Sequence, residues 1–327
     1  MEHNLSSEGL HGPRDPERGA KSIAIPDDFA RTIVEVHGAA AGVEWLGRLP
    51  TILADCEQRW SLEVLPPFAP LSYNYVAPAV RADGTDVVVK VGVPHPELLT
   101  EIEALRLYDG RGAVQLLDAV PDRGALLLER LEPGTPLASL PDDERATSIA
   151  AQVMRHLWRP VPPEHPFPSV AERAAGLEEL RDHFGGASGP FPATLVETAE
   201  TLFAELIGSM AEPVLLHGDL HHQNILAAER RPWLAIDCKG LAGEPAYEAA
   251  ALLLHNSMPQ LLAAPQPGRV LARRVDLLAE ELGLDRARLS GWGLAQAVLA
   301  AWQTFDDHGR GWEPWVACAE LLDALRA

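Results

Sequence analysis

Three side chains that carry oxygen ligands, Asp219, Asn224 and Asp237, stand at the ends of short apolar runs. The first two lie in the polar loop of the segment PVLLHGDLHHQNIL, and Asp237 ends the segment WLAID. Residues 225–227 and 233–236 are typical of two strands of an antiparallel hairpin. Because the open ends of a hairpin lie together, Asn224 and Asp237 are expected to lie side by side. An amide oxygen and a carboxylate suit a hard divalent cation such as Mg²⁺.

A second candidate group is Lys90, in the middle of DVVVKV, the most strand-like run of the chain. A lysine inside a valine-rich strand costs free energy unless an anion pairs with it. Glu101 and Glu103, in the helix predicted over 96–108, compete for that place. On the helical period, Glu101 falls at the edge of the apolar face and Glu103 nearly opposite it. We therefore predict that Glu101 is the partner of Lys90.

The spacing Asp-x-x-x-x-Asn from Asp219 to Asn224 resembles the catalytic loop of kinase-fold phosphotransferases, with His-Gly-Asp in place of His-Arg-Asp. The segments LLHGDLHHQNIL and AIDCKG look like aminoglycoside phosphotransferases, and among them like the streptomycin 6-kinase-like branch of aminoglycoside/hydroxyurea antibiotic resistance kinases. Further segments resemble that family in the expected order, namely PLSYNYVAPAVRADGTDVVVKVGVPHPELLTEIEALRLYDG, ALLLERLEPGTPL and GEPAYEAAALL. The resemblance covers residues 25–327.

The resemblance implies a role for each matching residue. Asp219 would be the catalytic base, and Asn224 and Asp237 would be the Mg²⁺ ligands. Lys90 would contact the α- and β-phosphates of ATP, with GTP as the open alternative. The remaining assignments are Glu101 as the partner of that lysine, backbone groups of Glu129 and Leu131 as the adenine contacts, and His217 as a support of the catalytic loop.

The sequence departs from the kinase pattern before Lys90, because residues 72–79 contain no glycine and so offer no glycine-rich phosphate loop. Ser72, Tyr73 and Asn74 are the candidates to cover the phosphates instead. Cys238 follows Asp237 at a position where the family commonly has proline.

The family resemblance implies a bilobal, protein-kinase-like α+β fold. We predict a flexible leader at 1–22, a nucleotide-binding lobe with leading helices at 23–131, and a helical lobe with the catalytic loop and substrate site at 132–327. The expected strands cover 72–77, 86–91, 113–117 and 125–130. The expected helices cover 29–40, 52–60, 96–108, 142–158, 169–184, 192–210, 268–284, 289–305 and 312–325.

The charge balance limits the partners of the chain. With 27 basic and 47 acidic residues the formal net charge is −20, which repels nucleic acid and anionic membranes and attracts a cationic small molecule. Three separated cysteines without a CxxC pair predict neither a disulfide framework nor a thiolate zinc site. With no apolar signal segment at the N-terminus, we expect a cytoplasmic protein, as a monomer or homodimer.

The resemblance implies that the acceptor is an aminocyclitol antibiotic such as streptomycin, with another small hydroxylated metabolite or hydroxyurea as alternatives. Candidate substrate contacts are Trp302, Asp306, Asp307 and Glu244; the alternatives are core packing for the tryptophan and an exposed loop for the two aspartates.

Two other classes of function stay open at this point. The chain could be a nucleotide-binding protein without catalysis, because the glycine-rich loop is missing. It could also be a metal-dependent hydrolase that binds zinc through His217, Asp219, His221 and His222.

Overall fold

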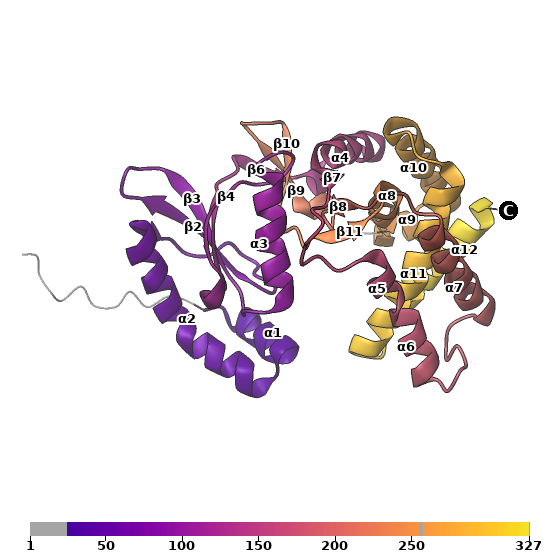
Figure 1. The fold of residues 1–327 in the computed structure, drawn as a ribbon, viewed down its shortest axis with the longest axis horizontal. Coiled ribbons are helices and arrows are strands. Elements are labelled where there is room, and N and C mark those ends of the chain that lie inside the picture. The colour runs from indigo at the N-terminus through magenta and orange to yellow at the C-terminus, as the bar shows by residue number, and fades with distance from the viewer. Residues whose placement is uncertain (1–24, 255–257, 327) are drawn as a thin grey trace, which may run out of the picture.

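The computed structural model describes residues 25–254 and 258–326, so the predicted leader at 1–22 lies outside the described residues. Two parts stand next to each other in Figure 1, and we call them the sheet lobe (27–129) and the helical lobe (133–326). The predicted α+β class is confirmed. The predicted domain boundary at 131/132 falls between the last strand of the sheet lobe and the next strand, and it stays a prediction.

The sheet lobe consists of one antiparallel sheet of five strands, in the order β1-β2-β3-β5-β4, with helices beside it (Figure 1). Its elements are α1 (Asp27–His37), α2 (Ala39–Trp60), β1 (Leu62–Val64), β2 (Tyr75–Arg81), β3 (Asp86–Val91), α3 (Pro96–Tyr108), β4 (Leu116–Val120), the short 3-10 helix η1 (Pro121–Arg123) and β5 (Ala125–Glu129).

The two faces of strand β3 have different surroundings, and one of them borders a cavity. Side chains alternate between the two faces of a strand. Val87, Val89 and Val91 are fully buried in a core shared with apolar residues of α1 and α2. Val88 and Lys90 therefore project from the opposite face, which is turned toward the helical lobe and lines a cavity there.

Several predicted elements of this lobe have wrong boundaries; the strand predicted at 113–117, for example, lies at Leu116–Val120. Helix α2 begins at Ala39 rather than at 52, although Gly42, Gly47 and Pro50 lie within it. Gly42 is needed there, because a Cβ would come within 2.9 Å of the Ile33 carbonyl oxygen of α1. Tertiary packing of the two helices thus outweighs weak helix propensity.

Strand β2 also begins later than predicted, at Tyr75 rather than at 72. The preceding residues 65–74 form an extended connection that contains Pro66, Pro67 and Pro70. This connection runs past the cavity before the chain enters the sheet.

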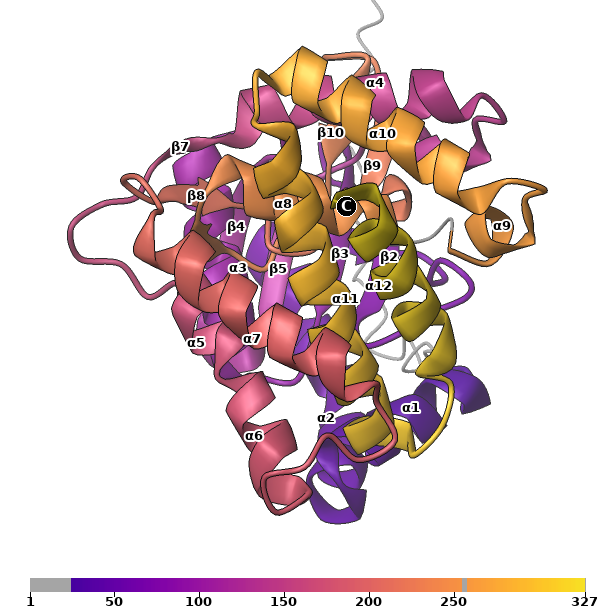
Figure 2. The same ribbon diagram turned by 90° about the vertical axis from the view of Figure 1, so that its right-hand side faces the viewer.

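The helical lobe contains two small three-stranded sheets, in the orders β10-β9-β6 and β11-β8-β7, and a large helical body, which Figure 2 shows from its own side. Its elements are β6 (Pro133–Pro136), η2 (Leu137–Ser139), α4 (Asp143–Leu157), β7 (Arg159–Pro160), α5 (Val170–Ala174), α6 (Gly176–His183), α7 (Ala193–Gly208), β8 (Val214–Leu216), η3 (His222–Asn224), β9 (Ile225–Ala228), β10 (Trp233–Ala235), β11 (Leu241–Gly243), α8 (Pro245–Leu254), α9 (Met258–Ala263), α10 (Pro267–Leu282), α11 (Arg286–His308) and α12 (Glu313–Arg326).

The hairpin predicted from residues 225–236 is confirmed, because β9 and β10 pair antiparallel with Ile225 opposite Ala235. The predicted helix at 169–184 divides into α5 and α6, and α8 and α9 were not predicted. Helix α11 passes through the middle of this lobe, where Trp292 is fully buried. Within the described residues, no helix is both long and apolar enough to cross a bilayer.

Candidate functional site

The buried lysine of β3 has the partner that the helix geometry predicts. Lys90 Nζ donates to both carboxylate oxygens of Glu101 at 2.6 and 2.8 Å, and it also pairs with Asp237. The two residues of α3 differ as predicted, because Glu103 pairs with Arg106 at the surface. Lys90 is only 4% exposed, and burial opposes its charge, but the two carboxylates outweigh burial and raise the pKa of the lysine. Lys90 is therefore a fixed cation.

Asn224 and Asp237 stand at the open end of the β9–β10 hairpin, as expected. The backbone N–H of Ile236 donates to the Asn224 carbonyl oxygen at 2.9 Å, which holds the two ends together. The Asn224 side-chain N–H donates to the carbonyl oxygen of Asp219 at 3.0 Å, so the amide oxygen is the atom left for a ligand. Nearby Lys90 lowers the pKa of Asp237 to about 2, which keeps this group a carboxylate.

This donor set fits Mg²⁺, which prefers carboxylate and carbonyl oxygens. Among the described residues, no group of three or more histidine, cysteine, aspartate or glutamate side chains gathers as a metal site. The alternative zinc site also lacks its first ligand. Both ring nitrogens of His217 are already engaged, since Nε2 donates to the Ile236 carbonyl oxygen at 2.8 Å and Nδ1 accepts from the Asp219 N–H at 3.3 Å.

His217 thus connects the loop before Asp219 to the strand end before Asp237. Its carbonyl oxygen also accepts the backbone N–H groups of Lys239 at 2.8 Å and Gly240 at 3.0 Å. The ring is completely buried, and burial lowers its pKa to about 4. The neutral ring is consequently the form that the folded protein holds.

The pKa of His217 predicts a loss of stability in acid. An unfolded histidine binds a proton near pH 6.5, whereas the folded protein resists protonation down to about pH 4. Between these values the unfolded chain binds more protons, so the free energy of unfolding falls as the pH falls. Its contribution between pH 7 and pH 5 should be about 2 kcal/mol.

Urea unfolding of the wild type and of His217→Gln at pH 7 and pH 5 measures this contribution. The glutamine can still donate to Ile236 but does not titrate, so the variant should lose about 2 kcal/mol less than the wild type on acidification. An equal loss in both proteins would contradict the prediction.

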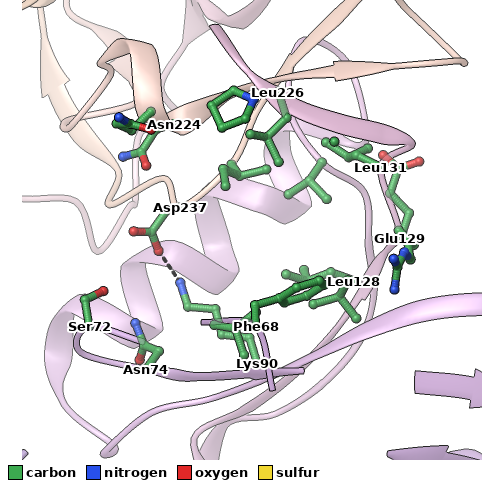
Figure 3. Close-up of a pocket in the computed structure, with 18 of the residues that line it drawn as sticks. Phe68, Ser72, Asn74, Lys90, Leu128, Glu129, Leu131, Asn224, Leu226 and Asp237 are labelled. Carbon is green, nitrogen blue, oxygen red and sulfur yellow. Dashed lines mark hydrogen bonds and ion pairs between the residues drawn. The ribbon is translucent and has the colours of Figure 1, made fainter. Parts of the chain in front are cut away.

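Two adjoining cavities lie between the lobes. The first, which we call the apolar cavity, has a volume of about 570 Å³ and is lined by Val88 and Leu128 from the sheet lobe and by Leu226 and Ile236 from the helical lobe. The second, the charged cavity, has about 670 Å³. Both cavities share Lys90, Asn224 and Asp237, which Figure 3 shows in the lining of the apolar cavity. A ligand with an apolar end and a charged end could therefore occupy the two cavities together.

The strand β5 and the chain after it form one edge of the apolar cavity, where Glu129 and Leu131 lie as expected. The Glu129 backbone N–H, however, donates to the Gln115 carbonyl oxygen at 3.0 Å. The sheet thus uses this amide, and the adenine contacts expected from backbone groups of Glu129 and Leu131 stay a prediction. The Glu129 side chain pairs with Arg230.

The connection before β2 covers both cavities. Ser72 and Asn74 line each of them, and Tyr73, 60% exposed, lines the charged cavity (Figure 3 shows Ser72 and Asn74). A Cβ on Gly92 would lie 2.2 Å from the Asn74 side-chain oxygen, so the glycine allows this close approach. Gly92 was not singled out in the sequence, because its effect depends on a residue that lies 18 positions away.

Asp219 borders a third space, the side cavity, of about 220 Å³ within the helical lobe. Asp219 and Lys239 line both the charged cavity and the side cavity. The other polar and aromatic residues that line the side cavity, none of them predicted, are Arg173, Tyr247, Glu248, Gln296, Gln303 and Trp315. They come from four helices, α5, α8, α11 and α12, so no local pattern marks them as one set.

None of the four predicted substrate contacts lines the side cavity. Trp302 is 3% exposed and packs against His183 and Phe184 in the core. Asp306 and Asp307 are exposed at the end of α11, outside the lining of the side cavity.

The fourth, Glu244, is buried and accepts hydrogen bonds from Trp292 Nε1 and, at 2.7 Å, from Arg288 Nε. Those contacts join the residue before α8 to α11, so they hold the fold together.

The chain is similar to known proteins in sequence and in fold. The family model described as aminoglycoside/hydroxyurea antibiotic resistance kinase matches residues 64–309. The chain is 35% identical over 308 residues to streptomycin 6-kinase of Streptomyces glaucescens. This alignment covers 94% of this chain and 98% of that protein. It is 37% identical over 304 residues to hydroxyurea phosphotransferase of Kitasatospora aureofaciens, covering 92% and 86%.

Among solved structures, choline kinase LicA from Streptococcus pneumoniae superimposes with a TM-score of 0.55 and 14% identity, covering 85% of this chain and 99% of that one. This likeness confirms the predicted protein-kinase-like fold. A second structure of LicA contains AMP.

Proposed function

Because the chain belongs to the aminoglycoside/hydroxyurea antibiotic resistance kinase family, we propose that it transfers the γ-phosphoryl group of ATP to a hydroxyl group of a small antibiotic. One observation carries the assignment to this site. Asp219 stands between a cavity that holds Lys90, Asn224 and Asp237 and a separate side cavity. A donor on one side and an acceptor on the other would therefore meet at this carboxylate.

The apolar cavity would hold adenine between Val88 and Leu226, and the charged cavity would hold the triphosphate. Lys90 would contact the α- and β-phosphates, while Ser72 and Asn74 would cover them from the sheet lobe. Asn224 and Asp237 would hold Mg²⁺, which supplies charge neutralisation at the β- and γ-phosphoryl oxygens when bound. The retention of these groups argues against a nucleotide-binding protein without catalysis.

In the transfer step, the acceptor hydroxyl oxygen forms a bond to the γ-phosphorus while the bond from that phosphorus to the β-phosphate oxygen breaks. ADP leaves, and the hydroxyl proton passes to Asp219 and then to water. An aspartate with a pKa of about 3.9 is a weak base for an alcohol, so the proton should move late. Orientation of the hydroxyl by Asp219 is the main contribution, because phosphoryl transfer has a loose transition state.

The acceptor that the relatives favour is streptomycin, and the net charge of −20 suits its guanidinium groups. Hydroxyurea is the second candidate. It is favoured by the 37% identical relative and by the small volume of the side cavity, about 220 Å³.

Mass spectrometry tests both acceptors directly. Purified protein is incubated with Mg·ATP or Mg·GTP and with streptomycin, other aminoglycosides, hydroxyurea or simple sugars. We expect the mass of streptomycin to increase by one phosphoryl group when ATP is the donor. Phosphorylation of hydroxyurea alone would select the second candidate, and no product with any compound would count against the proposed function.

A further inference from the structure

Lys239 is a cation next to Asp219 that the roles above do not use. Its Nζ lies 3.6 Å from Asp219 Oδ2 and 3.3 Å from Glu97 Oε1 of α3. It is also one of the two residues that line both the charged cavity and the side cavity. Lys239 therefore lies where the transferred group would pass from one cavity to the other.

The backbone of Lys239 is fixed from two sides. Its N–H donates to the His217 carbonyl oxygen at 2.8 Å, and its carbonyl oxygen accepts from the Thr100 hydroxyl at 2.6 Å. The ammonium group is held less tightly, because 3.3 and 3.6 Å exceed the 2.7–2.9 Å typical of strong charge-assisted hydrogen bonds. A fixed backbone with a movable charge suits a group that exchanges partners when a ligand arrives.

The charged cavity has few cationic side chains that could bind the terminal phosphate. Among the described residues that line the charged cavity, Lys90 and Lys239 are the two lysine or arginine side chains. Lys90 is already paired with Glu101 and Asp237. The connection before β2 contains no glycine, so it offers no flexible loop of backbone N–H groups over the terminal phosphate.

We propose that Lys239 is a catalytic residue that leaves Glu97 and contacts the γ-phosphoryl oxygens during transfer. The inference rests on the proposed phosphoryl transfer and adds a group to it. As the bond to the β-phosphate oxygen breaks and the bond to the acceptor oxygen forms, the ammonium group would stay within reach of the phosphoryl oxygens, and its proton would not be transferred. Burial opposes the charge on Lys239, but Asp219 and Glu97 raise its pKa, which agrees with a permanent cation.

The test compares Lys239→Met with Glu97→Gln. If Lys239 stabilises the phosphoryl group, Lys239→Met should lower kcat by about 10²–10³-fold with little change in the KM for ATP. Glu97→Gln removes only the resting partner and should keep kcat within about fivefold. Lys239→Arg, which keeps the charge, should recover part of the lost rate, whereas Lys239→Gln should not.

A binding measurement separates this role from a structural one. The methionine variant should bind Mg·ADP as the wild type does, but it should lose about 10²-fold in affinity for Mg·ADP with aluminium fluoride, which mimics the phosphoryl group in transit. Equal losses of kcat in Lys239→Met and Glu97→Gln would overturn the inference, since the pair would then serve only to join α3 to the loop. So would an unchanged kcat in Lys239→Met.

The activity of the wild type is measured separately, as the rate of ADP release in the presence of the acceptor and in its absence. A wild type that transfers to neither would refute the proposed function, and the inference about Lys239 would fall with it. A wild type that turns over while the methionine variant matches it would refute the lysine role alone.

Discussion

Replacement of Asp219 by alanine is expected to lower kcat by about 10²–10⁴-fold while the affinity for Mg·ATP stays nearly unchanged. Asp219 borders the side cavity and the charged cavity but lies outside the lining of the apolar cavity. Its carboxylate would therefore act on the acceptor hydroxyl and not on the base of the nucleotide. Steady-state rates of ADP release and titration calorimetry with Mg·ATP measure the two quantities separately.

Asp306→Ala is the matched control. This aspartate is exposed at the end of α11 and lines none of the apolar, charged and side cavities. It should keep both kcat and the KM for the acceptor. An Asp219→Ala enzyme that retains most of its activity would remove this residue from the mechanism. A loss of acceptor affinity in Asp306→Ala would restore the sequence-based assignment of that residue.

The second large effect is expected for Asp237→Asn, which should abolish the dependence of nucleotide binding on Mg²⁺. In the wild type, the carboxylate and the Asn224 amide oxygen would hold the metal, and Mg²⁺ should strengthen ATP binding. The asparagine lacks the negative charge, and loss of a metal ligand should weaken metal-dependent binding by about 10²-fold or more.

Calorimetric titrations with ATP, in Mg²⁺ and in EDTA, provide the comparison. The variant should show the same weak affinity in both solutions, while the wild type should differ between them. Normal Mg·ATP affinity in Asp237→Asn would exclude this aspartate as a metal ligand. Glu103→Gln on the surface of α3 is a useful control, because its carboxylate pairs only with Arg106 in the contacts described.

The arrangement around Lys90 could be predicted because each part depends on local geometry. The alternation of side chains along a strand assigns Lys90 to one face of the sheet. The helical period places Glu101 and Glu103 on different faces of α3. The β9–β10 hairpin brings Asn224 next to Asp237. These periods follow from the backbone alone. The ion pairs then bring these local elements together at one place.

Other features depend on contacts between distant residues and could not be read from the pattern. The residues 72–74 have strand-like composition, yet β2 begins at Tyr75, and Asn74 packs over Gly92. The first half of α2 contains residues that usually end helices, yet α1 packs against it at Gly42. In both cases tertiary contact decides the outcome against local propensity.

The residues that line the side cavity, where the acceptor would bind, were even harder to predict from the sequence. Aromatic and acidic residues near the C-terminus suggested Trp302 and Asp306, whereas the side cavity is lined by Arg173, Gln296 and Trp315 from α5, α11 and α12. A cavity between helices is defined by which faces meet. No spacing within one helix contains that information.

The prolines of the connection before β2 have a thermodynamic consequence. Pro66, Pro67 and Pro70 restrict the backbone before any nucleotide arrives. Ordering a flexible residue costs about 1–2 kcal/mol, and a glycine-rich loop incurs that cost when it closes over phosphates. Here the prolines remove part of that conformational entropy in the free protein, so nucleotide binding should carry a smaller entropic penalty and a smaller difference in amide hydrogen exchange over residues 65–74.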